Sequence, residues 1–138
     1  MMCCEICKKI GKTSAGWSVN LLRLFIAWIF IKSGAGKLFG WFDGPGIENF
    51  ITFMGSLGFL SPMAYFVGWT EFIGGILFAF GLLTRVTAVS FIIVMVVAIV
   101  KVHPNDYFYP ATVLMSSLVI LHLGAGKFSL DWLLTRNK

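Results

Sequence analysis

Four long apolar segments, joined by mostly short connections, constrain the fold of this chain more than any other feature. Each segment runs for about 17–21 residues, and a helix that rises about 1.5 Å per residue needs about 20 residues to cross a hydrocarbon core of about 30 Å. The 138 residues are 58% hydrophobic and only 12% charged, and a water-soluble domain of this length cannot bury that much apolar surface. The sequence therefore predicts four membrane-spanning helices. They occupy residues 19–39, 63–83, 86–102 and 107–123.

We expect an all-α polytopic membrane protein in which these four transmembrane helices form an antiparallel bundle. The link Thr84-Arg85 allows only a tight hairpin between the second and third segments. The longest connection, residues 40–62, carries apolar residues at helical spacing, and Pro45 suits the first turn of a helix. This pattern predicts an amphipathic helix lying in the outer interface between helices 1 and 2. An irregular re-entrant loop is the alternative, because glycines interrupt the pattern.

The sequence predicts a single domain between two short tails. Residues 1–17 form a cytoplasmic tail that we expect to be disordered, residues 18–134 form the four-helix transmembrane domain, and residues 135–138 form a second cytoplasmic tail. All three cysteines lie in the first tail, where we expect them to be reduced and to have no structural role. Redox, metal-binding and acylation roles are the alternatives. The cysteines are Cys3, Cys4 and Cys7.

The distribution of lysine and arginine predicts the orientation of the chain in the membrane. If the amino terminus is cytoplasmic, seven basic residues flank the inner side and two flank the outer side, as the positive-inside rule requires. Both termini are therefore expected in the cytoplasm. Because the basic residues lie beside apolar segments, we interpret the net charge of +5 as a topology signal and predict no nucleic-acid partner. The inner residues are Lys8, Lys9, Lys12, Arg85, Lys127, Arg136 and Lys138, and the outer residues are Lys37 and Lys101.

Three ionisable residues inside the predicted spans form the candidate site: Arg23, Lys37 and Glu71. A charged residue at the centre of a transmembrane helix costs about 2.5–3.5 kcal/mol, so it is usually paired or faces the interior of a bundle. Arg23 and Lys37 fall on one side of the first helix, and Glu71 falls on a side of the second helix that is rich in small residues, so we expect the two sides to meet. Glu71 then either forms a structural ion pair with Arg23 or Lys37, or titrates within a proton or quinone site. No residue is assigned a catalytic role.

Other polar residues of the spans and turns each have a structural interpretation and a functional one. Lys32 points away from Arg23, and we expect its ammonium to reach the outer boundary, with pairing to Glu71 as the alternative. His103 lies in the predicted outer turn, where it is either an interfacial polar residue or, like Glu71, a candidate for cofactor contact. His122 lies near the opposite membrane face, so the two histidines cannot share a metal and no metal site is predicted.

Several stretches of the chain resemble the DoxX family. Two stretches resemble the first and second helices of that family, namely LLRLFIAWIFIKSGAGKLFGWF and WTEFIGGILFAFGLLTRVTAV. Two shorter stretches resemble its outer turn and its closing element, namely KVHPNDYF and GAGKFSLDWLL. The resemblance covers about residues 19–134. The residues that carry it include Arg23, Lys37 and Glu71, but neither Lys32 nor the cysteines. It implies a four-helix, multi-pass protein of the bacterial inner membrane that is associated with quinone-linked or oxidative-stress complexes.

On these grounds we expect an accessory subunit of a membrane redox complex. Whether the chain is an enzyme stays open, because at most it would be a non-catalytic or quinone-contacting subunit of an oxidoreductase complex. No intrinsic cofactor is predicted, quinone is the candidate ligand, and lipids and redox proteins are the expected partners. A small proton-coupled transporter, with Glu71 binding the coupling ion, and a noncatalytic membrane scaffold are the alternatives. The oligomeric state is not predicted.

Overall fold

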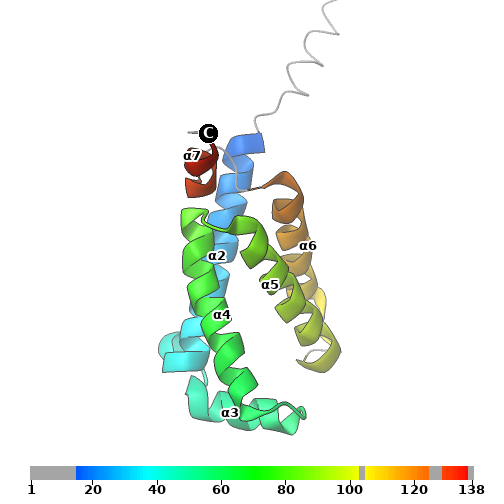
Figure 1. The fold of residues 1–138 in the computed structure, drawn as a ribbon. Helices are drawn as coiled ribbons and strands as arrows, with labels where there is room; N and C mark the ends of the chain where they lie inside the picture. The colour runs from blue at the N-terminus through cyan, green and yellow to red at the C-terminus, as the bar shows by residue number, and fades with distance from the viewer. Residues whose placement is uncertain (1–14, 103–104, 125–128, 137–138) are drawn as a thin grey trace, which may run out of the picture.

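The computed structural model describes residues 15–102, 105–124 and 129–136, and every element assigned there is helical (Figure 1). This confirms the predicted all-α class. The first and last helices extend slightly past the predicted domain limits at residues 18 and 134. The helices are α2 (Ala15–Phe39), α3 (Gly46–Ser56), α4 (Ser61–Phe80), α5 (Thr84–Val97), α6 (Phe108–Leu123) and α7 (Leu130–Arg136), with the short helical segments η1 (Trp41–Asp43) and η2 (Ala98–Val102).

Three helices in the described part of the chain are long and apolar enough to cross a membrane. They run over Trp17–Phe39, Ser61–Phe80 and Thr84–Val102, and the last of these joins α5 to η2. Helix α6 coincides with the fourth predicted span, but with 16 residues it is one of the shorter apolar helices. The fourth crossing therefore stays a prediction.

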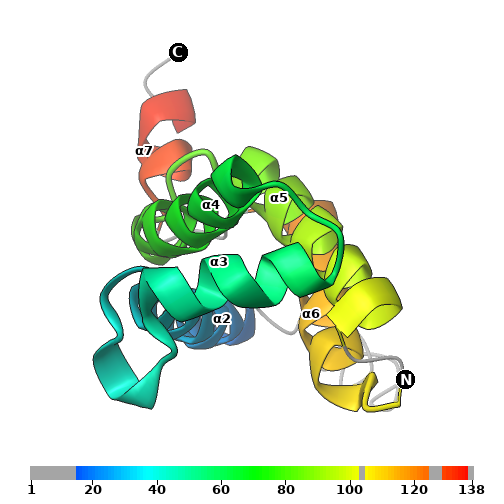
Figure 2. The same ribbon diagram turned by 90° about the horizontal axis from the view of Figure 1, so that it is seen from below.

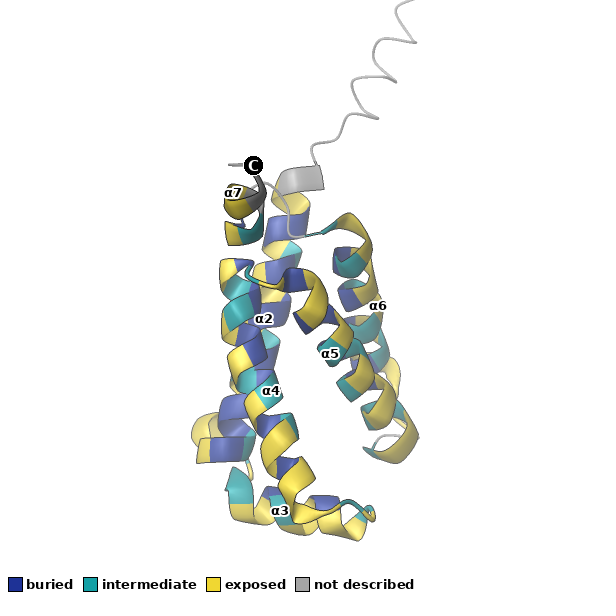
Figure 3. Ribbon diagram, viewed as in Figure 1, coloured by how far each residue is buried: buried dark blue, intermediate teal, exposed yellow. Residues whose placement is uncertain are grey.

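The outer faces of the long helices are apolar, as contact with lipid requires. Figure 3 shows exposed residues along α4, α5 and α6. An exposed apolar surface of this extent marks contact with lipid or with another protein. Its large side chains include Phe66, Phe80, Val86, Ile93 and Met115.

Helix α3 fills the longest connection and lies across the ends of α2 and α4 (Figure 2). Phe50 and Met54 on its inner side are buried and form a small cluster with Ala64 of α4. The connection therefore contains a helix, as the apolar spacing predicted, and is not an irregular loop throughout. The position of α3 in the membrane interface stays a prediction.

Helices α2 and α4 approach so closely that glycine is needed at their contact. A Cβ atom placed on Gly34 of α2 would lie 2.5 Å from the backbone nitrogen of Phe72, and one placed on Gly75 of α4 would lie 2.8 Å from the backbone nitrogen of Ile31. Small residues allow helix backbones to approach in this way in lipid. The prediction that the small-residue sides of these two helices face each other is confirmed.

A cluster of three phenylalanines ties α5 to this pair. The rings of Phe30 and Phe91 stack with centroids 3.5 Å apart, and the ring of Phe78 meets Phe91 edge-on at 5.3 Å. Towards α3, the pair formed by α5 and α6 diverges from the pair formed by α2 and α4 (Figure 1). The two helix pairs are therefore in contact around the phenylalanines, and their backbones are further apart near α3.

The C-terminal helix α7 is attached to the turn between α4 and α5. The carboxylate of Asp131 accepts hydrogen bonds from the backbone N–H groups of Leu83 at 3.0 Å and Thr84 at 2.9 Å, and the Asp131 N–H donates to the carbonyl of Gly81 at 3.1 Å. Leu83 has a φ of 50°, a left-handed conformation that is unfavourable for leucine. Asp131 thus caps the start of α5 and holds this turn in place.

The close contact of α2 with α4 predicts opposite effects for two Gly→Ala substitutions. Gly34→Ala should lower the free energy of unfolding by about 1–3 kcal/mol, because the added methyl group meets backbone atoms of Phe72 that cannot move aside. Gly55→Ala in α3 is the matched control, because no atom lies within 4 Å of its added Cβ, and it should raise stability by about 0.5–1 kcal/mol through helix propensity. Denaturant unfolding in detergent measures both, and the same sign at both positions would contradict this packing.

The cap on α5 predicts a second loss of stability. Asp131→Ala should lower the free energy of unfolding by about 0.5–2 kcal/mol, because two backbone N–H groups lose their acceptor. Asp106→Ala, in the exposed turn before α6, should change it by less than about 0.5 kcal/mol. The comparison is made by thermal unfolding in detergent, and equal losses in the two variants would show that the cap is not the cause.

Candidate functional site

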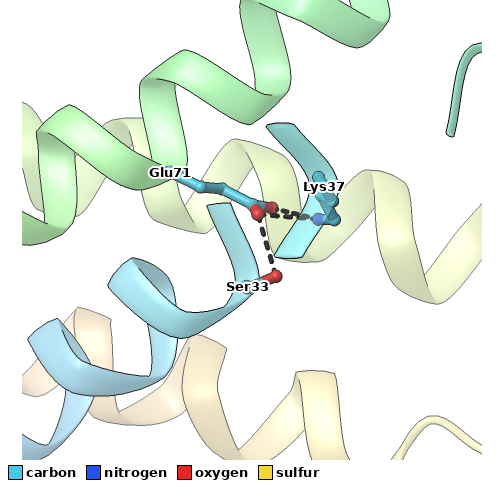
Figure 4. A network of polar contacts seen from close by, with 3 residues as sticks. All are labelled: Ser33, Lys37 and Glu71. Atoms are coloured by element: carbon cyan, nitrogen blue, oxygen red, sulfur yellow. Dashed lines mark hydrogen bonds and ion pairs between the residues drawn. The ribbon is translucent and has the colours of Figure 1, made fainter. Parts of the chain in front are cut away.

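Glu71 of α4 is held by two side chains of α2 (Figure 4). Its Oε1 and Oε2 atoms accept hydrogen bonds from Nζ of Lys37 at 2.6 and 2.7 Å, and Oγ of Ser33 donates a third bond to Oε2 at 2.9 Å. The side chain of Glu71 is 0% exposed and that of Lys37 is 24% exposed. The cluster is therefore an ion pair with an added hydroxyl donor, enclosed around the acid and partly open at the base.

The spacing of residues along α2 explains why both donors reach one carboxylate. Ser33 and Lys37 are four residues apart and lie one above the other on the same side of the helix. Gly34 lets α4 come close enough for the short Ser33 side chain to reach Glu71. Ser33 was not predicted as a site residue, although its spacing from Lys37 was a signal that could have identified it.

Of the two basic residues predicted as partners of Glu71, the structure brings Lys37 to it and places Arg23 elsewhere. Arg23 is buried near the other end of α2, where its Nη1 would lie 2.8 Å from a Cβ placed on Gly81. Nearly four helical turns, or about 21 Å, separate Arg23 from Lys37, so one carboxylate cannot bind both. Arg23 therefore lies with the α4–α5 turn and α7, outside the Glu71 cluster.

The remaining candidates lie outside the described residues. These are His103, proposed for cofactor contact, and Cys3, Cys4 and Cys7 of the first tail. Within the described ranges there is no group of three His, Cys, Asp or Glu side chains that could hold a metal ion. The site is therefore built from Ser33, Lys37 and Glu71.

An open cleft of about 890 Å³ lies beside this cluster, within the range of about 300–1,000 Å³ for small-molecule sites. The cleft lies where the helix pairs diverge, and α3 contributes Phe50, Phe53 and Met54 to its lining. Nζ of Lys37 is 5.2 Å from the centroid of the Phe50 ring, a distance typical of a cation–π contact. The walls also include Trp28, Trp41, Phe66, Ile93 and Tyr109. The cleft is therefore largely apolar, with the ion pair in its wall.

Lys32 lines the same cleft but is not bonded to Glu71. It is exposed, whereas the hydrogen bonds that Glu71 accepts within the described residues come from Ser33 and Lys37. The alternative that Lys32 pairs with Glu71 is therefore not what the structure shows.

The cluster can present a hydrogen-bond donor to a molecule in the cleft. A lysine ammonium has three N–H donors, and contact with the two oxygens of Glu71 leaves one for a ligand. The carboxylate of Glu71 is 0% exposed, so the ammonium of Lys37 is the charged group of the cluster that a ligand would meet directly. This donor suits an apolar molecule that carries a small oxygen-containing head.

Comparison with known proteins places the chain among bacterial membrane proteins. The sequence profile of the DoxX family matches residues 18–104. An uncharacterized protein of Haemophilus influenzae is 33% identical over an alignment of 140 positions, which covers 94% of this chain and 91% of that protein. No solved structure matches the chain significantly.

Two further relatives are similar over shorter stretches. CatD of Bacillus subtilis, whose name assigns it provisionally to the oxidoreductases, is 40% identical over 82 residues, 59% of this chain and 57% of CatD. The inner membrane protein YqjF of Escherichia coli is 36% identical over 70 residues, 51% of this chain and 49% of YqjF. The chain thus spans about half the length of these two relatives.

The geometry of the ion pair predicts that replacing Lys37 destabilises the protein more than replacing Glu71. Lys37→Met should lower the free energy of unfolding by about 3–5 kcal/mol, because it leaves a fully buried carboxylate with Ser33 as its remaining donor. Glu71→Gln should cost less, because the partly exposed ammonium can turn towards the cleft. Detergent unfolding of the single variants and of the double variant tests this order, and the double variant should be more stable than Lys37→Met alone.

Lys101→Met is the control for removing a lysine near the end of a span. Lys101 is exposed in η2 and does not line the cleft, so its loss should change stability by less than about 0.5 kcal/mol. If Lys37→Met were no more damaging than Lys101→Met, the ion pair would not be a stabilising contact.

Proposed function

We propose, from the premise that this chain belongs to the DoxX family, that it is an accessory subunit of a membrane redox complex whose cleft receives the ring of a quinone. The chain is a membrane protein with relatives named as an oxidoreductase and as an inner membrane protein. Those names support a redox role in the bacterial inner membrane. Within the described residues, the Glu71 cluster is where such a ligand would find hydrogen-bonding groups beside an apolar cleft.

We further propose a topology of four crossings with both termini in the cytoplasm. Helix α6 would supply the fourth crossing, which at 16 residues requires little tilt or some local thinning of the bilayer. Helix α3 would lie in the outer interface with its buried side against α4. The cleft would then be in the outer half of the membrane, open to the lipid phase in which quinones are dissolved.

The observation that carries the proposal is a paired, fully buried carboxylate in the wall of an apolar cleft. A quinone combines ring carbonyls, which accept hydrogen bonds, with an apolar chain. The remaining N–H of Lys37 would donate to one carbonyl. When a quinol is oxidised, its two electrons would pass to a partner redox protein. Glu71 would take up one proton by relay through the Lys37 ammonium, which contacts both carboxylate oxygens, and the other proton would pass to water at the open side of the cleft. This chain would bind the quinone ring and accept one of its protons.

The packing favours this binding role over a proton-coupled transporter. A transporter needs a site that opens to each side of the membrane in turn. Between Glu71 and the inner end of the bundle, the core is filled by Phe30, Phe78 and Phe91, which are at most 1% exposed. Such packing favours access from the cleft side alone. A noncatalytic scaffold is distinguished by having no quinone bound at all.

Quinone binding is expected to quench tryptophan fluorescence, because Trp28 and Trp41 line the cleft. A ubiquinone or menaquinone analogue titrated into the protein in mild detergent should give a saturable decrease. The double variant Lys37→Gln/Glu71→Gln removes both charges without leaving either unpaired, and it should bind about tenfold more weakly, since a hydrogen bond to a charged group contributes about 1.5–3 kcal/mol.

Lys101→Gln is the matched control and should bind quinone as the wild type does. Thermal unfolding of each variant shows whether it is folded. Lipids extracted from the purified protein should contain quinone, and redox proteins should copurify with it. Quenching that never saturates, together with an extract free of quinone, would leave a scaffold as the better assignment.

A further inference from the structure

We infer that the same cleft binds a long-chain carboxylate, the anion of a fatty acid, with Lys32 binding the carboxylate head. This inference goes beyond the proposed function, because it concerns a different ligand class and a residue that the quinone site does not use. It rests on the charges that line the cleft and on the shape of its apolar walls.

The cleft carries one more positive charge than negative charge. Lys32 and Lys37 both line it, and Glu71 is its acidic lining residue. Lys37 is bonded to both oxygens of Glu71, so that pair is neutral. Lys32 is exposed, and no ion pair joins it to another described residue. An unpaired ammonium beside an apolar membrane cleft is unfavourable, and a single anionic group would neutralise it.

The apolar walls suit a single hydrocarbon chain. They come from both helix pairs, with Phe25 and Trp28 on α2 and with Ile93 and Val97 on α5. Inside a bilayer, such an opening is filled by whatever apolar molecule fits it, because water gains no hydrogen bonds there. Its volume of about 890 Å³ is that of a site for one small ligand. A diacyl phospholipid would have to place one of its two chains outside.

The position of the lysine also fits the head of such a molecule. Lys32 lies one residue before Ser33 on α2 and lines the same cleft, so along the helix axis its Cα is only about 1.5 Å from the level of Ser33. A carboxylate is compact and singly charged, and it accepts hydrogen bonds from an ammonium at short distance. The hydrocarbon tail of the ligand would then run along the apolar walls towards the lipid.

Brominated lipids test the inference through Trp28 and Trp41, because bromine quenches a tryptophan that it contacts. Dibromostearate and the corresponding brominated alcohol have the same chain and differ in the charge of the head. At alkaline pH in a nonionic detergent, dibromostearate should bind wild-type protein at least about tenfold more tightly than the alcohol, which corresponds to about 1.4 kcal/mol.

Lys32→Gln should abolish this preference by weakening binding of the carboxylate to the level of the alcohol. Binding of the alcohol should be unchanged in Lys32→Gln, which shows that the cleft remains folded. Lys101→Gln should keep the full preference. The inference is overturned if wild-type protein shows no preference, if Lys32→Gln retains it, or if a brominated phosphatidylglycerol binds more tightly than the single-chain carboxylate.

The quinone titration separates this inference from the proposed function. Lys32→Gln should leave quinone quenching unchanged, and stearate should compete with quinone for wild-type protein. If stearate binds through Lys32 and quinone does not bind at all, the proposed function fails and the carboxylate site stands. If quinone binds and the carboxylate shows no dependence on Lys32, the carboxylate site fails and the proposed function stands.

Discussion

The bond between Lys37 and Glu71 is the interaction on which the rest of the structure depends. A carboxylate with no exposed surface needs a partner, because neither lipid nor apolar side chains replace the hydrogen bonds that it makes in water. Lys37 and Ser33 supply those bonds from one side of α2. They fix both the rotation of α2 and its height against α4. Gly34 and Gly75 make the contact possible, because larger side chains there would separate the two backbones.

The cleft is a consequence of where the packing of the bundle stops. Stacked rings of Phe30 and Phe91 hold α5 against α2, and beyond them the two helix pairs diverge. The ion pair lies in the wall of the resulting opening, and α3 contributes Phe50 and Met54 to the same opening. The closely packed half gives the bundle its stability, and the divergent half leaves polar groups within reach of a lipid-soluble molecule.

Two kinds of oxygen-containing head are compatible with this one opening, for different physical reasons. The neutral Lys37–Glu71 pair offers the Lys37 ammonium as a donor at short range, which matches the carbonyl oxygen of a quinone ring. Lys32 adds a net charge, which matches an anion. Membership of the DoxX family supports the redox assignment, whereas Lys32 is not among the residues that carry the resemblance, although it lies within the first quoted stretch. Ligand choice in this chain therefore depends on side chains of α2 that are neighbours in sequence.

The sequence by itself determined the helical class and the apolar segments, because these follow from composition and from the length needed to cross a bilayer. It favoured a helix in the long connection over an irregular loop, and it offered a basic partner as one of two states for Glu71 because of the cost of charge in lipid. It left open whether Arg23 or Lys37 was that partner, since both lie on one side of the same helix. In the tertiary structure the partner is Lys37, because the close contact of α2 with α4 sets Glu71 at the depth of Ser33 and Lys37. Arg23 lies about 21 Å from Lys37 along the helix. The capping of α5 by Asp131 and the divergence that forms the cleft were likewise decided in three dimensions, because they join residues far apart in the chain whose distances no local pattern contains.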